Sequence, residues 1–286
     1  MLIRNRLIEN LEKAVLTCDQ AERETLTNFI IVGGGPTGVE LAGALAEFKR
    51  YILEKDYPEI ESSMMNIYLI EMLPHILPGL SEFASGKAEK TLDRLGVTIL
   101  PESKVHYFDG QTVITGTGEQ LTAQTLIWAA GVQANVPKGL PEDIFVKGSR
   151  IRVDEYSKIT GMNDIFAIGD VAAMINKNRP KGHPMVATVA IQQGATLGKQ
   201  FLKLVNNSDR IKPFRYKDKG MLATIGKTQA VADLKHLTVN GFIAWLIWAT
   251  VHLYYMVGVK NKLVTVLSWF YHYLTYDKAN RHIFKG

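Results

Sequence analysis

Cysteine is almost absent from this chain: Cys18 is the single one among 286 residues. One cysteine cannot close an internal disulfide or complete a C-x-x-C redox or zinc site, so both are excluded within this chain. The seven histidines are scattered without metal-ligand spacing, and we expect no metal site. Residues 1–20 are charged and lack the apolar run that forms the core of a secretory signal peptide.

Acidic residues are also scarce toward the end of the chain. From Ile211 to Gly286, eleven Lys/Arg stand against three Asp/Glu, a net charge of +8, so the remainder carries −3 to give the total of +5. Three of the four tryptophans lie in the same region. No RNA- or DNA-binding signature accompanies this charge. A basic, aromatic segment of this kind indicates binding to anionic lipid more than to nucleic acid.

The most informative run that is present joins a short apolar strand, Phe29–Val32, to a glycine-rich turn and a helical pattern over residues 41–48. In this context the G-x-G-x-x-G glycines have distinct tasks. Gly33 allows the tight turn, Gly35 lets the backbone approach a pyrophosphate, and Gly38 allows close packing of helix and strand. The phosphates would lie at the positive N-terminus of the helix. We therefore predict a dinucleotide-binding loop.

A second apolar strand, residues 67–70, ends in Glu71. A carboxylate in this position accepts hydrogen bonds from the adenosine ribose hydroxyls. The separation from the glycines exceeds the usual spacing of about twenty residues, which we attribute to an extended first helix and loop over residues 49–65. Met72, Leu73 and Pro74 follow, with no Arg or Lys to hold a 2′-phosphate, so the sequence favours NADH over NADPH.

The remaining pattern is that of an α/β protein. A helix is expected near the N-terminus, with a linker near residues 25–28, and the alternation of apolar strands and helices then continues to residue 131. We further expect a helix at 82–95 that ends at Gly96, followed by a strand at 97–100. A hairpin at 105–114 should turn at Asp109-Gly110, and a last strand should span residues 125–130.

A second unit is expected after residue 131. It contains an apolar strand over residues 164–170 that ends in Gly-Asp, a helix over 186–204 and a strand region over 221–234. The tail segment 241–259 has no charged residue and precedes Lys260 and Lys262. Three arrangements stay open for the tail: helices lying in one leaflet, a membrane-spanning helix, or a buried hairpin.

Five motifs, in this order, resemble the type II NADH:quinone oxidoreductases. They are GGGPTGVE (33–40), WAAGV (128–132), FAIGD (166–170), AIQQG (190–194) and ATIG (223–226). The resemblance implies a Rossmann-like NADH-binding domain inserted in an FAD-binding domain, with a C-terminal helical tail that associates with the membrane. It divides the chain into a linker helix (1–27), the NADH domain (28–131), the C-terminal part of the FAD domain (132–236) and membrane-anchoring helices (237–286). The family's N-terminal FAD fingerprint is not in this chain, so we expect a fragment, a truncated product or a misassigned start.

The resemblance also implies site residues. It assigns Gly169 and Asp170 to the ribityl-pyrophosphate portion of FAD, and Ala130 and Gly131 to cofactor binding. Glu40 matches the family acid near the junction of nicotinamide and flavin, although a helix-dipole role is the alternative.

Gln192 and Gln193 match positions bordering the flavin and quinone pocket, where amides can donate to a quinone carbonyl. On a solvated helix face they would instead be ordinary surface residues. The family often has a further Gln where this chain has Thr188, on the same helix face as Gln192. At Thr188 this chain therefore departs from the family pattern for the quinone pocket.

For the intact protein the resemblance implies hydride transfer from NADH to FAD and two-electron reduction of a membrane quinone in a respiratory chain. The expected location is the cytoplasmic face of the bacterial membrane, peripheral and monotopic, with a homodimer left open. Alternatives are a flavoprotein disulfide reductase relative and a non-catalytic, membrane-associated NADH-binding module. A sulfide:quinone reductase is disfavoured because no cysteine follows Cys18.

Overall fold

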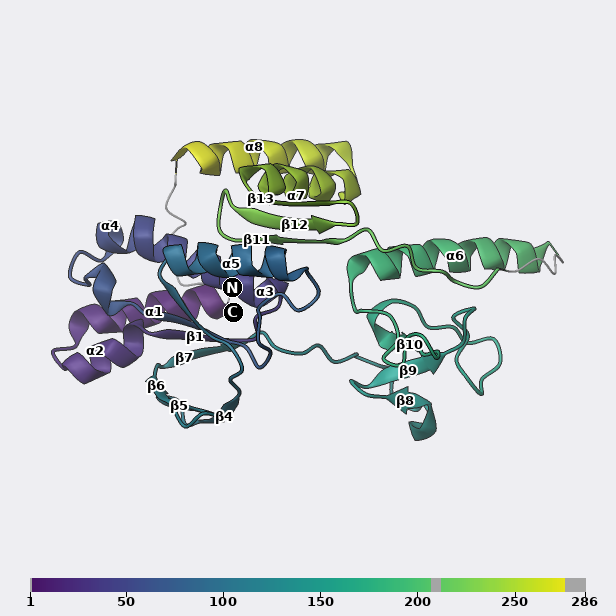
Figure 1. Cartoon of the computed structure of the whole chain (residues 1–286), viewed down its shortest axis with the longest axis horizontal. Helices are drawn as coiled ribbons and strands as arrows, with labels where there is room; N and C mark the ends of the chain where they lie inside the picture. Colours follow the sequence, from purple (N-terminus) through teal and green to yellow (C-terminus); the bar gives the residue numbers. More distant parts are fainter. Residues whose placement is uncertain (1, 207–211, 276–286) are drawn as a thin grey trace. The chain divides into compact units, whose positions relative to one another are not determined.

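The computed structural model of the chain describes residues 2–206 and 212–275. These residues divide into two units, one formed by residues 2–130 together with 220–275 and the other by residues 131–219. Figure 1 labels the helices and strands.

A four-stranded parallel sheet organises the first unit. Its strands are β1 (Phe29–Val32), β2 (Ile67–Ile70), β3 (Val97–Leu100) and β7 (Thr125–Trp128), in the order β3-β2-β1-β7. The register sets Phe29 beside both Ile67 and Thr125. All four residues of β1 are buried, as expected of a central strand covered on both faces. Both apolar strands predicted from the sequence, at 29–32 and 67–70, are confirmed.

Alternate side chains of these strands enter two different cores. Ile31 and Leu69 pack with residues of α3 (Pro36–Phe48) and α5 (Glu82–Arg94). Ile30 and Ile70 point to the other face and pack with residues of a small antiparallel sheet. That sheet consists of β4 (Val105–Phe108), β5 (Thr112–Thr115) and β6 (Gln120–Thr122). The parallel sheet is thus covered by helices on one face and by strands on the other (Figure 1).

Two local predictions rest on turn and cap residues, and both are confirmed. Helix α5 begins after Ser81, whose side chain accepts a hydrogen bond from Ala84 N, and Gly96 follows its end at φ +83°. The β4–β5 hairpin turns at Gly110, which has φ +102°, and the Asp109 side chain accepts hydrogen bonds from two following backbone N–H groups.

The N-terminal residues form two helices, α1 (Leu2–Leu16) and α2 (Gln20–Thr27), where one linker helix was expected. Asp19 interrupts the helical run by capping α2 through Ala21 N. The linker expected near residues 25–28 is wrong, because α2 continues to Thr27. Leu11 of α1 is fully buried in the helix-side core, so α1 is an integral part of the first unit.

The second unit contains β8 (Phe145–Val146), β9 (Arg150–Val153), β10 (Ala172–Met174) and the long helix α6 (Ala187–Val205), which confirms the predicted helix. The strand expected over residues 164–170 is wrong. Only Phe166 forms a bridge, to Lys158, and Gly169–Val171 is a 3-10 turn. A strand forms only where a neighbour pairs with it, and no described segment pairs with residues 165–168 beyond this bridge.

A three-stranded antiparallel sheet follows in the first unit: β11 (Met221–Thr224), β12 (Ala230–Leu234) and β13 (Leu237–Gly241). The domain boundary expected after residue 236 falls within the β12–β13 hairpin. The units instead divide at Lys219, because β11 and β12 pack against α3 and α5. The first unit therefore includes the whole of this sheet.

Helices α7 (Phe242–Tyr255) and α8 (Val259–Thr275) complete the described chain. Large apolar side chains on both helices are exposed, among them Ile243, Leu263 and Leu267. Within residues 2–206 and 212–275, no helix combines the length and hydrophobicity needed to cross a bilayer. Short helical turns elsewhere are Lys49–Leu53, Glu54–Asp56, Ser62–Met64 and Glu142–Ile144.

Candidate functional site

The loop between β1 and α3 requires glycine at two of its fingerprint positions. A Cβ atom on Gly33, which has φ +110°, would lie 2.8 Å from atoms of Ala130. A Cβ on Gly38 would lie 1.9 Å from the Gly33 carbonyl oxygen. Neither position has room for a side chain, so turn and helix pack in direct backbone contact. The structure shows the tight turn expected at Gly33 and the close packing expected at Gly38. Ala130 lies against the loop at Gly33.

Gly35 differs from these two glycines. No atom lies within 4 Å of the position of its missing Cβ, and Gly35 is the N-terminal capping residue of the 13-residue helix α3. The first backbone N–H groups of a helix have no partners within the helix and attract anions. The loop thus has an open side at Gly35, where a pyrophosphate can approach the backbone. The residues present fit the phosphate bridge of a dinucleotide.

Glu71 lies beside this loop at the end of β2 and is 7% exposed. One carboxylate oxygen accepts a hydrogen bond of 2.6 Å from Gly34 N, and the other accepts one of 2.9 Å from Leu73 N. Each carboxylate oxygen can accept a further bond. The Glu71 carboxylate is therefore fixed next to the loop with acceptor capacity left for a ribose hydroxyl. Its bond to Gly34 was not foreseen from the sequence.

Glu40 lies in α3 and accepts a hydrogen bond of 3.2 Å from the Thr224 hydroxyl of β11. It is the fifth residue of the helix, beyond the first turn where a carboxylate complements the dipole best. Farther along α3, Glu47 accepts a bond of 2.6 Å from Lys227 N. Burial raises the pKa of Glu47, and the bond and charge of Lys227 oppose that rise. A hydrogen bond thus connects Glu40 to Thr224 of the ATIG motif. No motif in the sequence indicates the contact between Glu47 and Lys227.

In the second unit the flavin-type motif and the glutamine motif meet. Gly169 has φ +72°, and its N–H donates a hydrogen bond of 2.7 Å to the side-chain oxygen of Gln193, which is 1% exposed. Gln192 forms two bonds of 3.0 Å with the backbone of Lys217, one as donor and one as acceptor. Thr188 pairs with the Tyr216 hydroxyl. Both glutamines therefore bind backbone groups of their own unit.

A buried cation, Arg150, lies in the second unit. The Arg150 guanidinium donates to the carbonyl oxygens of Ala172, Lys181 and His183. Burial lowers the pKa of Arg150, and the Asp170 carboxylate opposes this change. The Arg150 Nε and His183 Nδ1 atoms are buried and have no partner among the described residues. Sequence reasoning missed both, because an isolated Arg and an isolated His carry no motif.

Gly131 follows Ala130 at the start of the second unit and has φ +74°. Asp170 is an exposed residue of the turn Gly169–Val171. In the described part of the chain, no group of three His, Cys, Asp or Glu side chains has the geometry of a metal site. The predicted site residues therefore form two sets. The NADH-type set lies in the first unit, and the flavin-type and glutamine set lies in the second.

Two family models match this chain. The pyridine nucleotide-disulphide oxidoreductase model matches residues 6–194, and the NDH2 C-terminal domain model matches residues 219–276. The second match begins where the first unit resumes, close to Lys219.

Known proteins agree with these matches. The chain is 34% identical to the type II NADH:quinone oxidoreductase Ndh of Mycobacterium tuberculosis, over 93% of this chain and 58% of that protein. It is 30% identical to a probable NADH dehydrogenase of Dictyostelium discoideum, over 93% of this chain and 59% of that protein. The structure of NDH2 from Plasmodium falciparum in complex with NADH has the same fold, with a TM-score of 0.87 at 21% identity, covering 99% of this chain and 72% of that one.

The chain thus spans slightly more than half the length of the curated relatives it matches. The family expected from the five motifs is confirmed, and so is the expected α/β fold. This chain belongs to the pyridine nucleotide-disulphide oxidoreductase family and, within that family, is a partial homologue of the type II NADH:quinone oxidoreductases.

Proposed function

We propose that this chain is the NADH-binding and C-terminal portion of a type II NADH:quinone oxidoreductase, which oxidises NADH through FAD and reduces a membrane quinone. One observation carries the proposal: Gly35 opens the N-terminus of α3 to a phosphate while Glu71 lies fixed beside the same loop. The chain spans 58% of the M. tuberculosis relative, so the rest of the FAD site belongs to the part of the intact protein outside this chain.

In this proposal the first unit holds NADH. The backbone around Gly33, Gly35 and Gly38 meets the pyrophosphate, and Glu71 accepts a ribose hydroxyl with its remaining lone pairs. Ala130 borders the loop. Glu40, bound to Thr224, is assigned to the nicotinamide side of the site. A carboxylate in the position of Glu71 repels a 2′-phosphate, so the site should prefer NADH to NADPH.

The second unit would hold part of FAD. When bound, the flavin supplies the redox chemistry, and the protein supplies binding and orientation. The chain contains one G-x-G-x-x-G run, which we assign to NADH, so its contribution to FAD is limited to Gly131, Gly169 and Asp170. Gln193 positions the Gly169 backbone through its oxygen, and its amide nitrogen is assigned to the quinone side. The Gln192 amide nitrogen donates one N–H to the Lys217 carbonyl, and its second N–H is assigned to the quinone side.

We further propose that the tail binds the cytoplasmic face of a bacterial membrane without crossing it. Helix α7 has 14 residues, fewer than the roughly twenty that a spanning helix needs. The exposed apolar side chains of α7 and α8, followed in sequence by basic residues, suit helices lying in the interface of an anionic bilayer.

The test is a change of nucleotide preference at Glu71. In Glu71→Arg, NADH should bind at least tenfold more weakly, as expected from losing a charged hydrogen bond, and the preference for NADH over NADPH should shrink or reverse. Because Arg also removes the Gly34 contact, Glu71→Gln is measured beside it as a variant of the same size. Glu59→Arg makes the same charge change at an exposed residue outside the site and is the control.

Calorimetric titration with each nucleotide measures the outcome. The proposal predicts wild-type behaviour for Glu59→Arg, weaker NADH binding for Glu71→Gln, and altered selectivity for Glu71→Arg. Unchanged affinity for both nucleotides in folded Glu71→Arg and Glu71→Gln would contradict the assignment of Glu71.

A further inference from the structure

Gly34, the middle residue of the glycine run, forms two hydrogen bonds with the segment that follows β2 and has no room for a side chain beside it. Its N–H donates to Glu71 at 2.6 Å, and its carbonyl oxygen accepts from Leu77 N at 2.6 Å. A Cβ atom on Gly34 would lie 2.8 Å from the Ile76 side chain. The shape of the loop therefore depends on where residues 71–77 lie.

That segment does not hold its shape through regular secondary structure. Residues 71–80 form neither a helix nor a strand, and Leu77 has φ +53°, a left-handed conformation that a leucine rarely adopts. A bulky residue in this region costs free energy and persists only where the surroundings fix it. Something outside the segment must therefore stabilise Ile76 and Leu77.

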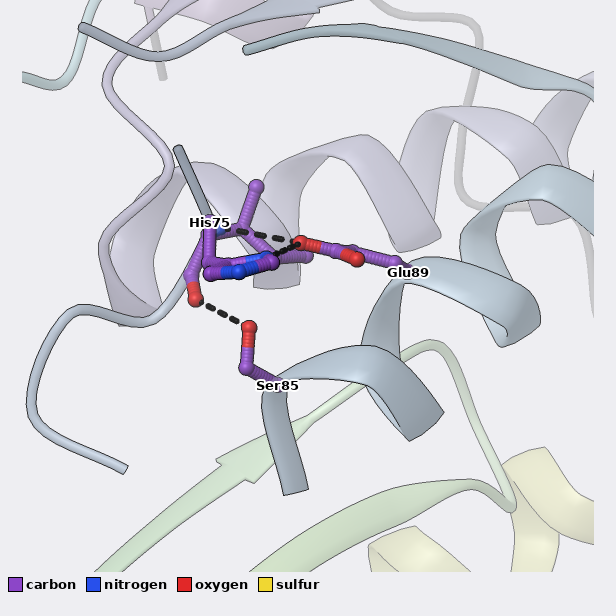
Figure 2. A network of polar contacts seen from close by, with 4 residues as sticks. His75, Ser85 and Glu89 are labelled. Carbon is purple, nitrogen blue, oxygen red and sulfur yellow. Dashed lines mark hydrogen bonds and ion pairs between the residues drawn. The ribbon is translucent and has the colours of Figure 1, made fainter. Parts of the chain in front are cut away.

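Helix α5 provides that support, as Figure 2 shows. The Ser85 hydroxyl donates a hydrogen bond of 2.7 Å to the Ile76 carbonyl, and Ile76 N donates one of 3.3 Å to Glu89. The same Glu89 oxygen lies 3.3 Å from His75 Nδ1. Both backbone groups of Ile76 are thus bound by two side chains one helical turn apart, and the Ile76 side chain is fully buried.

We propose that Ser85 and Glu89 are positioning residues for nucleotide binding. The described side-chain hydrogen bonds of both residues go to residues 75 and 76, not to the loop itself. The two side chains hold the backbone of Ile76 in place through hydrogen bonds. Ile76 and Leu77 in turn position Gly34, and the Gly34–Glu71 bond sets the conformation in which the loop binds the dinucleotide. The inference rests on the proposed NADH site and goes beyond it, because it assigns two residues of α5, which carry no nucleotide-binding motif, to the affinity of that site.

The alternative is that the two side chains only stabilise the fold. The two readings differ in what they predict for folded protein. A purely structural role lowers the unfolding temperature and leaves the NADH affinity of the folded molecules unchanged. A positioning role weakens NADH binding at temperatures where the variant is fully folded, and it loosens the Leu77 and Gly34 amides.

The experiment uses the 286-residue chain with Ser85→Ala, Glu89→Ala and Glu89→Gln. Asp93→Ala is the control, because Asp93 is an exposed acid one turn beyond Glu89 with no described side-chain partner. NADH and ADP are titrated below the unfolding transition, and hydrogen exchange is followed in the peptides that contain Gly34 and Leu77. ADP is included because it carries the pyrophosphate without the nicotinamide.

We expect about three- to tenfold weaker binding of both ligands in Ser85→Ala and Glu89→Ala, the effect of one lost hydrogen bond, with faster exchange at Leu77. Glu89→Gln keeps an oxygen acceptor for Ile76 N and should recover most of the affinity. Asp93→Ala should bind like the wild type. If Glu89→Ala does not fold, Ser85→Ala carries the test against Asp93→Ala.

Two negative results have different meanings. Wild-type affinity in folded Ser85→Ala and Glu89→Ala, with NADH binding intact in the wild type, would overturn the positioning role and leave the proposed function standing. Absence of NADH binding in the wild type would overturn both.

Discussion

Two glycines within helices give a sharp test of how α3 packs. Gly43 lies in α3 and Gly86 in α5, and helix propensity alone predicts that alanine stabilises each helix by about 1 kcal/mol. Their surroundings differ. A Cβ on Gly43 would lie 2.6 Å from Gly226 N and 3.0 Å from the carbonyl carbon of Ile225, whereas no atom lies within 4 Å of a Cβ on Gly86.

The contacts at Gly43 decide the sign of its effect. The atoms that a new methyl group would meet belong to the backbone of Ile225 and Gly226, in the turn that follows β11, so they cannot rotate away. Overpacking of this kind costs about 1–3 kcal/mol, and a contact this short belongs at the upper end. After the gain in helix propensity, Gly43→Ala should destabilise the first unit by about 2 kcal/mol. Gly86→Ala should stabilise it by up to about 1 kcal/mol.

Tryptophan fluorescence is the appropriate assay, because all four tryptophans lie in the first unit. At about 2–4 °C per kcal/mol for a unit of this size, we expect the Tm to rise by a few degrees in Gly86→Ala and to fall by about 4–8 °C in Gly43→Ala. Equal stabilisation by both substitutions would refute the close approach of α3 to β11, and with it the geometry that joins Glu40 to Thr224.

Two further predictions concern the buried histidine and the tail. Burial, Arg179 and Arg150 lower the pKa of His183 from its usual value of 6.5, so the unfolded state takes up a proton first as the pH falls. The second unit should therefore lose stability below about pH 6.5 in urea titrations, and His183→Phe should remove this dependence; an identical pH profile in the variant would count against the assignment. Leu263→Glu with Leu267→Glu, two exposed positions on one face of α8, should abolish co-sedimentation with anionic vesicles, and retained sedimentation would contradict the proposed role of the tail.

Elements with strong local signals could be predicted from the sequence. The strand at 29–32 is an apolar run, and the helix Glu82–Arg94 lies between the cap residues Ser81 and Gly96. The hairpin is marked by its turn residues Asp109 and Gly110. Gly33 and Gly38 could be assigned packing tasks because the flanking strand and helix identify the loop. These parts depend on neighbours in sequence.

The parts that could not be predicted depend on distant contacts. Residues 164–170 read as a strand, but a strand also needs a partner, and pairing is not visible in a strand's own sequence. The bond from Gly34 to Glu71 joins residues 37 apart, and that from Thr224 to Glu40 joins residues 184 apart. Ser85 and Glu89 look like ordinary helix residues, since only the conformation of Ile76 gives them a role.

The claim on which the account depends is that the loop between β1 and α3 binds NADH. The most direct measurement is a calorimetric titration of the purified 286-residue chain with NADH and, separately, with NADPH. The account predicts saturable binding of one NADH per chain and clearly weaker binding of NADPH. No binding of NADH, or equal affinity for the two nucleotides, would contradict it.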